Sequence, residues 1–143
     1  MPNTFIPVPM KVYIFGNGNI KYTDFETLYL KPIESVLSEK EVSFILCDFR
    51  GTDTLAMEYL KHLSPNVTVV HIGERPRYMP DKYRTKVSQW KVIGGFEDDS
   101  SRDAYAIEQC THFIATDFNS NEKRKSGTLK NIERCLELGK IQL

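Results

Sequence analysis

Ser126, Gly127 and Thr128 have the residue types and the position of an anion-binding turn. They follow an apolar run at 112–116 and a polar loop, and they open a segment up to residue 138 whose apolar residues recur at helical spacing. The first backbone N–H groups of a helix have no partner within the helix and favour negative charge, and a glycine there lets an anion approach the backbone. The pattern is typical of a phosphate-binding turn, although a Ser126 or Thr128 that only caps the helix explains it as well.

Two earlier loops repeat this order of strand, glycine with small polar residues, and helix. They are Gly16-Asn17-Gly18-Asn19 and Gly51-Thr52-Asp53. Asp53 would repel a phosphate but suits a ribose hydroxyl, and a helix cap explains it too. Because ligands of open α/β sheets bind beyond the carboxyl ends of the strands, we predict that the three loops form one nucleotide site. Its predicted ligand residues are Gly16, Gly18, Asn19, Gly51, Thr52, Asp53, Ser126, Gly127 and Thr128.

A sheet is needed to bring these loops together. Strand patterns occur at 11–15, 42–47, 66–72, 112–116 and, as a short edge strand, 141–143, with helical patterns between most of them. This alternation predicts an α/β fold: one Rossmann-like three-layer domain over 1–143, with a mostly parallel sheet of about five strands and helices on both faces.

Three segments depart from the simple alternation. We expect Pro32 to start or kink a helix, because a proline inside a helix loses a hydrogen bond. Residues 92–101 are rich in glycine and acidic residues and are expected to form a loop. Residues 75–91 contain six basic residues, two tyrosines and Trp90. They are expected either to lie over an edge of the sheet or to form a solvated basic surface.

The composition narrows the function classes. Nineteen basic and nineteen acidic residues cancel, so no global field attracts a nucleic acid or an anionic membrane. No apolar run is long enough to span a bilayer, and the first residues lack the features of a signal peptide. Cys47, Cys110 and Cys135 form no C-x-x-C pair and are typical of reduced thiols in a cytoplasmic protein. The histidines have no metal-ligand spacing, so we expect no bound metal, and we expect no cofactor. The neutral net charge and the lack of a spanning run lead us to expect neither a nucleic acid partner nor membrane contact.

Two groups of residues resemble the SLOG superfamily, which includes the DprA-like DNA-processing proteins and the LOG phosphoribohydrolases. Gly51-Thr52-Asp53, followed by Ala56 and Tyr59, is similar to the G-x-D-x-x-A-x-x-Y/A stretch of that superfamily. Arg102-Asp103, the apolar run at 113–115 and Ser126-Gly127-Thr128 resemble its arginine helix, F-I-A strand and G-T loop in order and spacing. The resemblance covers most of the chain and implies a Rossmann-like fold that binds a nucleotide or a nucleotide-derived ligand.

Arg102 and Asn131 bear on whether the chain is an enzyme. In the LOG enzymes an arginine and a glutamate serve the cleavage of an N-glycosidic bond. The resemblance puts Arg102 at the place of the arginine, as a candidate catalytic residue, and Asn131 at the place of the glutamate. Because asparagine cannot act as a general base, we expect a non-catalytic binder or sensor, with a LOG-like hydrolase or transferase as the alternative. Surface ion pairs with Asp98, Asp99 or Asp103 also explain Arg102.

The resemblance also bears on partners. It implies a homodimer, in which a second copy would cover Tyr78, Tyr83 and Trp90 of the 75–91 segment. A DprA-like binder of single strands, which would use the basic residues at 123–125 and 75–91, is a third interpretation. The neutral net charge counts against it.

Overall fold

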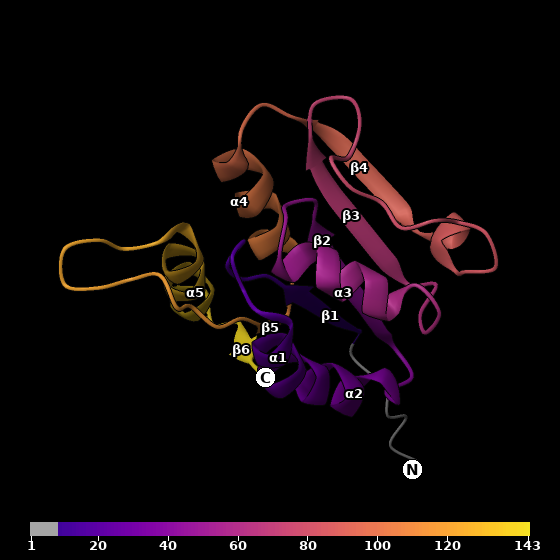
Figure 1. The fold of residues 1–143 in the computed structure, drawn as a ribbon, viewed down its shortest axis with the longest axis horizontal. Helices are drawn as coiled ribbons and strands as arrows, with labels where there is room; N and C mark the ends of the chain where they lie inside the picture. The colour runs from indigo at the N-terminus through magenta and orange to yellow at the C-terminus, as the bar shows by residue number, and fades with distance from the viewer. Residues whose placement is uncertain (1–8) are drawn as a thin grey trace, which may run out of the picture.

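A fully parallel sheet of six strands lies between two layers of helices in the computed structural model, which describes residues 9–143 (Figure 1). The strands are β1 (Met10–Ile14), β2 (Val42–Cys47), β3 (Val67–Ile72), β4 (Lys91–Phe96), β5 (His112–Ile114) and β6 (Ile141–Gln142). Their order in the sheet is β4-β3-β2-β1-β5-β6. The chain adds β2, β3 and β4 on one side of β1 and then crosses to add β5 and β6 on the other side. The direction of winding therefore changes between β1 and β5, and loops diverge at such a switch point.

The helices divide between the two faces of the sheet. One layer contains α1 (Tyr22–Phe25), α2 (Lys31–Leu37) and α3 (Thr52–Leu60), and the other contains α4 (Asp99–Gln109) and α5 (Gly127–Glu137). A short 3-10 helix, η2 (Val87–Gln89), precedes β4. None of the helices within residues 9–143 combines the length and the apolar character needed to cross a bilayer.

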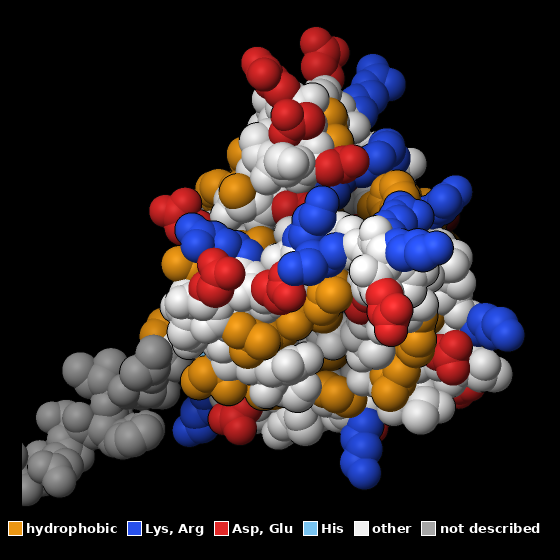
Figure 2. Space-filling view, turned by 90° about the vertical axis from the view of Figure 1, so that its left-hand side faces the viewer, with side chains coloured by type: hydrophobic (Ala, Val, Ile, Leu, Met, Phe, Trp, Pro, Cys, Tyr) orange, Lys and Arg blue, Asp and Glu red, His pale blue; other side chains and the backbone are white. Residues whose placement is uncertain are grey.

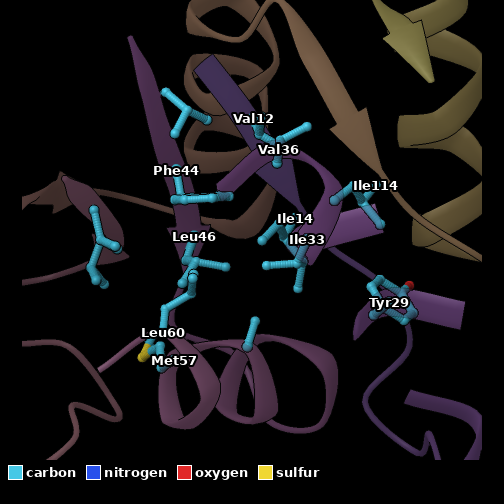
Figure 3. Close-up of a cluster of buried hydrophobic side chains, with 14 of the residues drawn as sticks. Val12, Ile14, Tyr29, Ile33, Val36, Phe44, Leu46, Met57, Leu60 and Ile114 are labelled. Atoms are coloured by element: carbon cyan, nitrogen blue, oxygen red, sulfur yellow. The ribbon is translucent and has the colours of Figure 1, made fainter. Parts of the chain in front are cut away.

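Alternation along the strands builds a separate core on each face. Val12 and Ile14 of β1 pack toward α2 and α3, where they join Phe44 and Leu46 of β2 (Figure 3). The intervening Tyr13 belongs to the core on the α4 and α5 side. Burying each of these large apolar side chains contributes roughly 1.5–3 kcal/mol. Because both faces of β1 and β2 are covered, most residues of these strands are apolar, with Lys11 and Ser43 as the polar exceptions.

The helix that contains Pro32 changes its hydrogen-bonding pattern directly before the proline. A π-helical segment, η1 (Glu26–Leu30), connects α1 to α2, and Pro32 lies in the first turn of α2. Since proline has no N–H to donate to the preceding turn, this change lets the helix continue through it. The π-helical segment also buries Tyr29, whose hydroxyl donates to the Phe15 carbonyl (2.8 Å) and accepts from the Thr116 N–H (2.9 Å). Tyr29 thus joins the ends of β1 and β5 where the two strands part.

The sheet has one strand more than the sequence predicted, because β4 forms within the segment expected to be a loop. β4 is an edge strand, and Val92 is 47% exposed, so it lacks the apolar pattern of a buried strand. The glycine at position 94 is required because a side chain there would clash with the buried His71 ring of β3. Gly94, one of the two glycines that indicated a loop, therefore serves strand packing, whereas Gly95 has a positive φ of +90°.

The 75–91 segment lies over the edge of the sheet near α3, and the chain itself covers two of its aromatic residues. Trp90 is buried, and its Nε1–H donates to the Ser64 carbonyl (2.8 Å). Tyr78 packs against the α3 side of the core and donates a hydrogen bond to Glu58. Only Tyr83 of the three remains exposed. The aromatic residues of this segment therefore give no reason to require a second copy of the chain.

Candidate functional site

A cleft of about 700 Å³ opens at the carboxyl ends of the strands, at the switch point between β1 and β5. It brings together the loops that follow β1, β2 and β5 and the first turns of α4 and α5. Eight of the predicted site residues line it: Gly16, Gly18, Asn19, Asp53, Arg102, Ser126, Gly127 and Thr128. The long loop between β5 and α5 extends away from the sheet beside this cleft (Figure 1).

Gly51 and Thr52, the other two predicted residues, lie behind the first loop and do not line the cleft. Gly51 has φ +78°, and a Cβ on it would lie 2.6 Å from the Gly18 carbonyl oxygen. Thr52 donates to the Asn17 carbonyl from its N–H (3.3 Å) and from its hydroxyl (3.1 Å). The two residues therefore hold the Gly16-Asn17-Gly18-Asn19 loop at close range, which only a glycine at position 51 permits.

Asn17 connects this loop to the loop that follows β5. Its buried side-chain amide donates to Asp117 Oδ1 (2.9 Å) and to Thr128 Oγ1 (3.3 Å), and its Oδ1 accepts from the Phe118 N–H (2.8 Å). Burial raises the pKa of Asp117, but hydrogen bonds from Ser120, Ser126 and Asn17 outweigh burial and lower that pKa to about 2. The carboxylate is thus a permanent anchor between the two loops.

The N-terminus of α5 combines a helix cap with free donors. The Ser126 hydroxyl donates to Asp117 Oδ1 (2.7 Å) and accepts from the Leu129 N–H (3.0 Å), so it caps the helix, as one of the two interpretations of the sequence held. The backbone N–H groups of Gly127 and Thr128 have no hydrogen-bond partner within residues 9–143. A Cβ built on Gly127 meets no atom within 4 Å. Capping therefore leaves two free N–H groups and open space at the cleft.

Arg102 lines the cleft but is held by three carboxylates. It is 4% exposed and donates from Nη1 to Asp48 Oδ1 (3.2 Å) and from Nε (3.1 Å) and Nη2 (2.9 Å) to Asp103 Oδ1. Asp99 lies 3.1 Å from Nη2. Asp99 and Asp103 pair with Arg102, as the sequence indicated, but the guanidinium is buried and Asp48 is a third partner. Asp98, the other expected partner, caps α4 instead. Arg102 therefore stabilises the fold around the cleft, and its contact with a ligand stays a prediction.

Asp48 is shared between Arg102 and a second arginine. Arg77, from the 75–91 segment, donates to Asp48 from its backbone N–H (2.7 Å) and from its guanidinium (3.2 and 3.3 Å). Burial raises the pKa of Asp48, but the hydrogen bonds and charge of Arg77, with the charge of Arg102, outweigh burial and lower it. The network thus fastens the long β3–β4 connection to β2 and α4.

Two further carboxylates face the cleft. Asp53 is 5% exposed, and its Oδ2 accepts from the Phe49 N–H (3.0 Å). Burial raises the pKa of Asp53 to about 7, although the Phe49 hydrogen bond and the charge of Arg102 act in the opposite direction. Asp103 Oδ2 accepts from Asn131 Nδ2 (3.0 Å). Asn131 therefore holds a carboxylate of the neighbouring helix, and this part of the cleft disfavours anions.

Several lining residues were not among the predicted ones: Tyr13, Phe15, Asn17, Cys47, Phe49, Arg50, Asp99, Asp103, Asn119, Arg124 and Asn131. Asn17 and Asn119 lie in loops that the sequence had identified. Asn131, which the resemblance had put at the place of the LOG glutamate, lies one helical turn after Gly127 and so faces the same cleft. Figure 2, which views the side of the β5–α5 loop, shows basic and acidic side chains next to one another and hydrophobic ones below them. The cleft lining is equally mixed, with Arg50 and Arg124 as cations outside the Arg102 network.

The fold resembles that of a DNA-processing protein. The structure matches that of DNA processing protein A from Helicobacter pylori with a TM-score of 0.54 and 16% sequence identity, over 94% of this chain and 74% of that one. No family model and no curated protein matches the sequence. The likeness supports the Rossmann-like fold that the SLOG resemblance implied, and at this identity it shows the fold alone.

The comparison corrects one expectation about partners. The neighbouring structure is described as having a single-stranded DNA binding mode. A protein of this fold therefore does bind a nucleic acid, and the sequence-based exclusion of a nucleic acid partner is wrong. That exclusion relied on net charge, which says nothing about how charges are distributed over one face of a molecule.

Proposed function

We propose that this chain binds a nucleotide or nucleotide-derived ligand in the cleft at the β1–β5 switch point. The observation that carries the proposal is the pair of free N–H groups of Gly127 and Thr128 at the N-terminus of an 11-residue helix, beside the cleft. Such groups and the helix dipole favour a phosphate. Gly16 and Gly18 of the first loop also line the cleft, and they let this loop pack closely against the side chains of Tyr29, Thr52 and Phe49.

The distribution of charge supports a small ligand with two chemically different ends. Three arginines and three aspartates line the cleft: Arg50, Arg102, Arg124, Asp53, Asp99 and Asp103. The aspartates stand near α3 and α4, while the free N–H groups belong to α5. A nucleotide has the required polarity, since its phosphate is anionic and its sugar and base carry hydrogen-bond donors.

A non-catalytic binder or sensor agrees better with this site than a LOG-like hydrolase or transferase. Asn131 cannot act as a general base, and its amide is hydrogen-bonded to Asp103. The nitrogens of Arg102 donate to protein carboxylates, so it has little capacity left for a substrate. The three buried free thiols, Cys47, Cys110 and Cys135, support a site of action in a reducing compartment such as the cytoplasm.

Isothermal titration calorimetry with nucleoside monophosphates tests the proposal. The variant Gly127→Val should weaken binding strongly, because a side chain would stand where the phosphate approaches the backbone. The fold should tolerate it, since a Cβ there meets nothing and valine has a slightly better helix propensity than glycine. Ser100→Val, in the exposed first turn of α4 outside the cleft, is the matched control. A folded Gly127→Val protein with wild-type affinity would refute the site.

We propose single-stranded DNA as a second candidate ligand, because the structural neighbour is described as binding it and the β5–α5 loop offers suitable groups. Lys123 and Arg124 are exposed on that loop, and Phe118 of the same loop is 47% exposed. Basic groups and exposed aromatic rings together suit a nucleic acid strand. Fluorescence anisotropy with a labelled oligothymidylate should show binding that weakens with salt and with Lys123→Ala. Lys40→Ala, at the opposite ends of the strands, is the control, and equal loss in both variants would contradict binding at this loop.

A further inference from the structure

Asp53 has one carboxylate oxygen that the protein leaves unused. Its side chain lines the cleft, and Oδ2 accepts from the Phe49 N–H, whereas Oδ1 has no hydrogen-bond partner within residues 9–143. No fully buried polar side-chain atom in this part of the chain lacks a partner. Since Asp53 is nevertheless 95% buried, Oδ1 must reach the free space of the cleft. A carboxylate oxygen in that position requires a hydrogen-bond donor.

The surroundings of Asp53 restrict what that donor can be. Asp53 carries a carboxylate of its own, and Asp103 and Asp48 lie close enough to raise its pKa although Arg102 lowers it, so Oδ1 favours a neutral donor over an anionic group of a ligand. Asp53 also lies near the proposed phosphate position. Thr52, its chain neighbour, donates to the Asn17 carbonyl, and the Asn17 side chain donates to Thr128 at the start of α5. Hydrogen bonds through Asn17 therefore connect the first turn of α3, which contains Asp53, to the first turn of α5.

In a nucleotide, the neutral donors nearest to the phosphate are the ribose hydroxyls. We propose that the cleft selects ribonucleotides over 2′-deoxyribonucleotides, with Asp53 Oδ1 accepting a hydrogen bond from the ribose 2′-hydroxyl. This inference rests on the proposed function and adds the identity of the sugar. A deoxyribose would leave the carboxylate oxygen dehydrated and unpaired, and a site built around a hydroxyl rejects the analogue that lacks it.

Calorimetric titration of AMP and 2′-deoxy-AMP into the wild-type protein and into Asp53→Asn tests the inference. At pH 8, above the pKa of about 7 that burial gives Asp53, the wild-type protein should bind AMP about 10- to 100-fold more tightly than 2′-deoxy-AMP, the range for a hydrogen bond to a charged group. In Asp53→Asn the amide oxygen can still accept from the Phe49 N–H. The variant should lose most of the preference for AMP while its affinity for 2′-deoxy-AMP changes little. Glu122→Gln, an exposed carboxylate outside the cleft, should behave as wild type.

The outcomes separate this inference from the function on which it rests. Equal affinities of the wild-type protein for AMP and 2′-deoxy-AMP would overturn the inference and leave nucleotide binding intact. A preference for AMP that persists in Asp53→Asn would also overturn the inference, because another residue would then accept the hydrogen bond from the 2′-hydroxyl. The affinities for AMP and IMP, which lacks the base amine, give a further comparison. A preference for AMP over IMP that disappears in Asp53→Asn would show that Asp53 Oδ1 accepts from the base amine, and would overturn the assignment to the sugar. No binding of any of these nucleotides would refute the proposed function itself.

Discussion

Replacing Asp53 by asparagine should change how the stability of the protein depends on pH. The folded protein raises the pKa of this carboxyl from 3.8 to about 7, chiefly because burial disfavours the charged form. Asp48 and Asp103 add to that rise, whereas Arg102 and the Phe49 N–H oppose it. The folded state therefore holds the Asp53 proton more tightly than the unfolded state does.

The sign and size of the effect follow from that difference. Between pH 4 and pH 7 the folded state binds more protons at Asp53 than the unfolded state, so the contribution of Asp53 to stability falls as the pH rises. A shift of about three pKa units corresponds to a loss on the order of 4 kcal/mol by pH 8. Asparagine does not titrate and keeps the Phe49 hydrogen bond. Relative to wild type, Asp53→Asn should therefore gain stability as the pH rises from 4 to 8.

Urea unfolding of both proteins at pH 4.5, 6 and 8 measures this difference. Asp48 and Asp117 have lowered pKa values, so their stabilising contributions are lost in acid. This loss occurs in both proteins and cancels when the two free energies of unfolding are subtracted. The free energy difference between Asp53→Asn and wild type should rise by several kcal/mol across this range. A difference independent of pH would show that Asp53 titrates normally and that burial does not disfavour its charged form.

Three further predictions concern residues around the cleft. Arg102→Ala should lower the free energy of unfolding by about 3–5 kcal/mol, because it leaves the buried Asp48 without one of its two cations, and calorimetry showing an unchanged melting temperature would contradict this. Gly51→Ala should destabilise the fold by about 1–3 kcal/mol because of its positive φ and the close Gly18 carbonyl, whereas Gly127→Ala should not, and similar urea midpoints for both would refute the distinction. Asp117→Asn should remove stability that is present above pH 4 and is lost in wild type as the pH falls toward 2; parallel acid-unfolding curves of the two proteins would count against the anchoring role.

Much of the fold could be predicted from the sequence, because buried parallel strands have distinctive compositions. The bounds of β2 agree with the prediction, and those of β1 and β3 agree within one residue, since each is a short apolar run followed by glycine or polar residues. β4 could not be predicted in this way. Its exposure and its two glycines hide the pattern, and only the position of His71 across the sheet explains Gly94.

The candidate site was predictable in its loops but not in its ion pairs. Glycine and small polar residues after three strands indicated where a ligand could bind, and the sheet order brings those three loops to one cleft. The sequence could not show that Arg77 and Arg102 both meet Asp48, because the three residues are far apart along the chain. For that reason the burial of Arg102 and its ion pairs with protein carboxylates could not be predicted from the sequence.

In the proposed function, a nucleotide phosphate binds to the backbone N–H groups at the start of α5. Amide ¹⁵N–¹H spectra of the protein during a titration with AMP test it most directly. We predict that the amide signals of Gly127 and Thr128 shift the most, together with those of Gly18 and Asn19, while that of Ser100 at the start of α4 stays in place. Saturating AMP that leaves the Gly127 and Thr128 signals unmoved would contradict the claim.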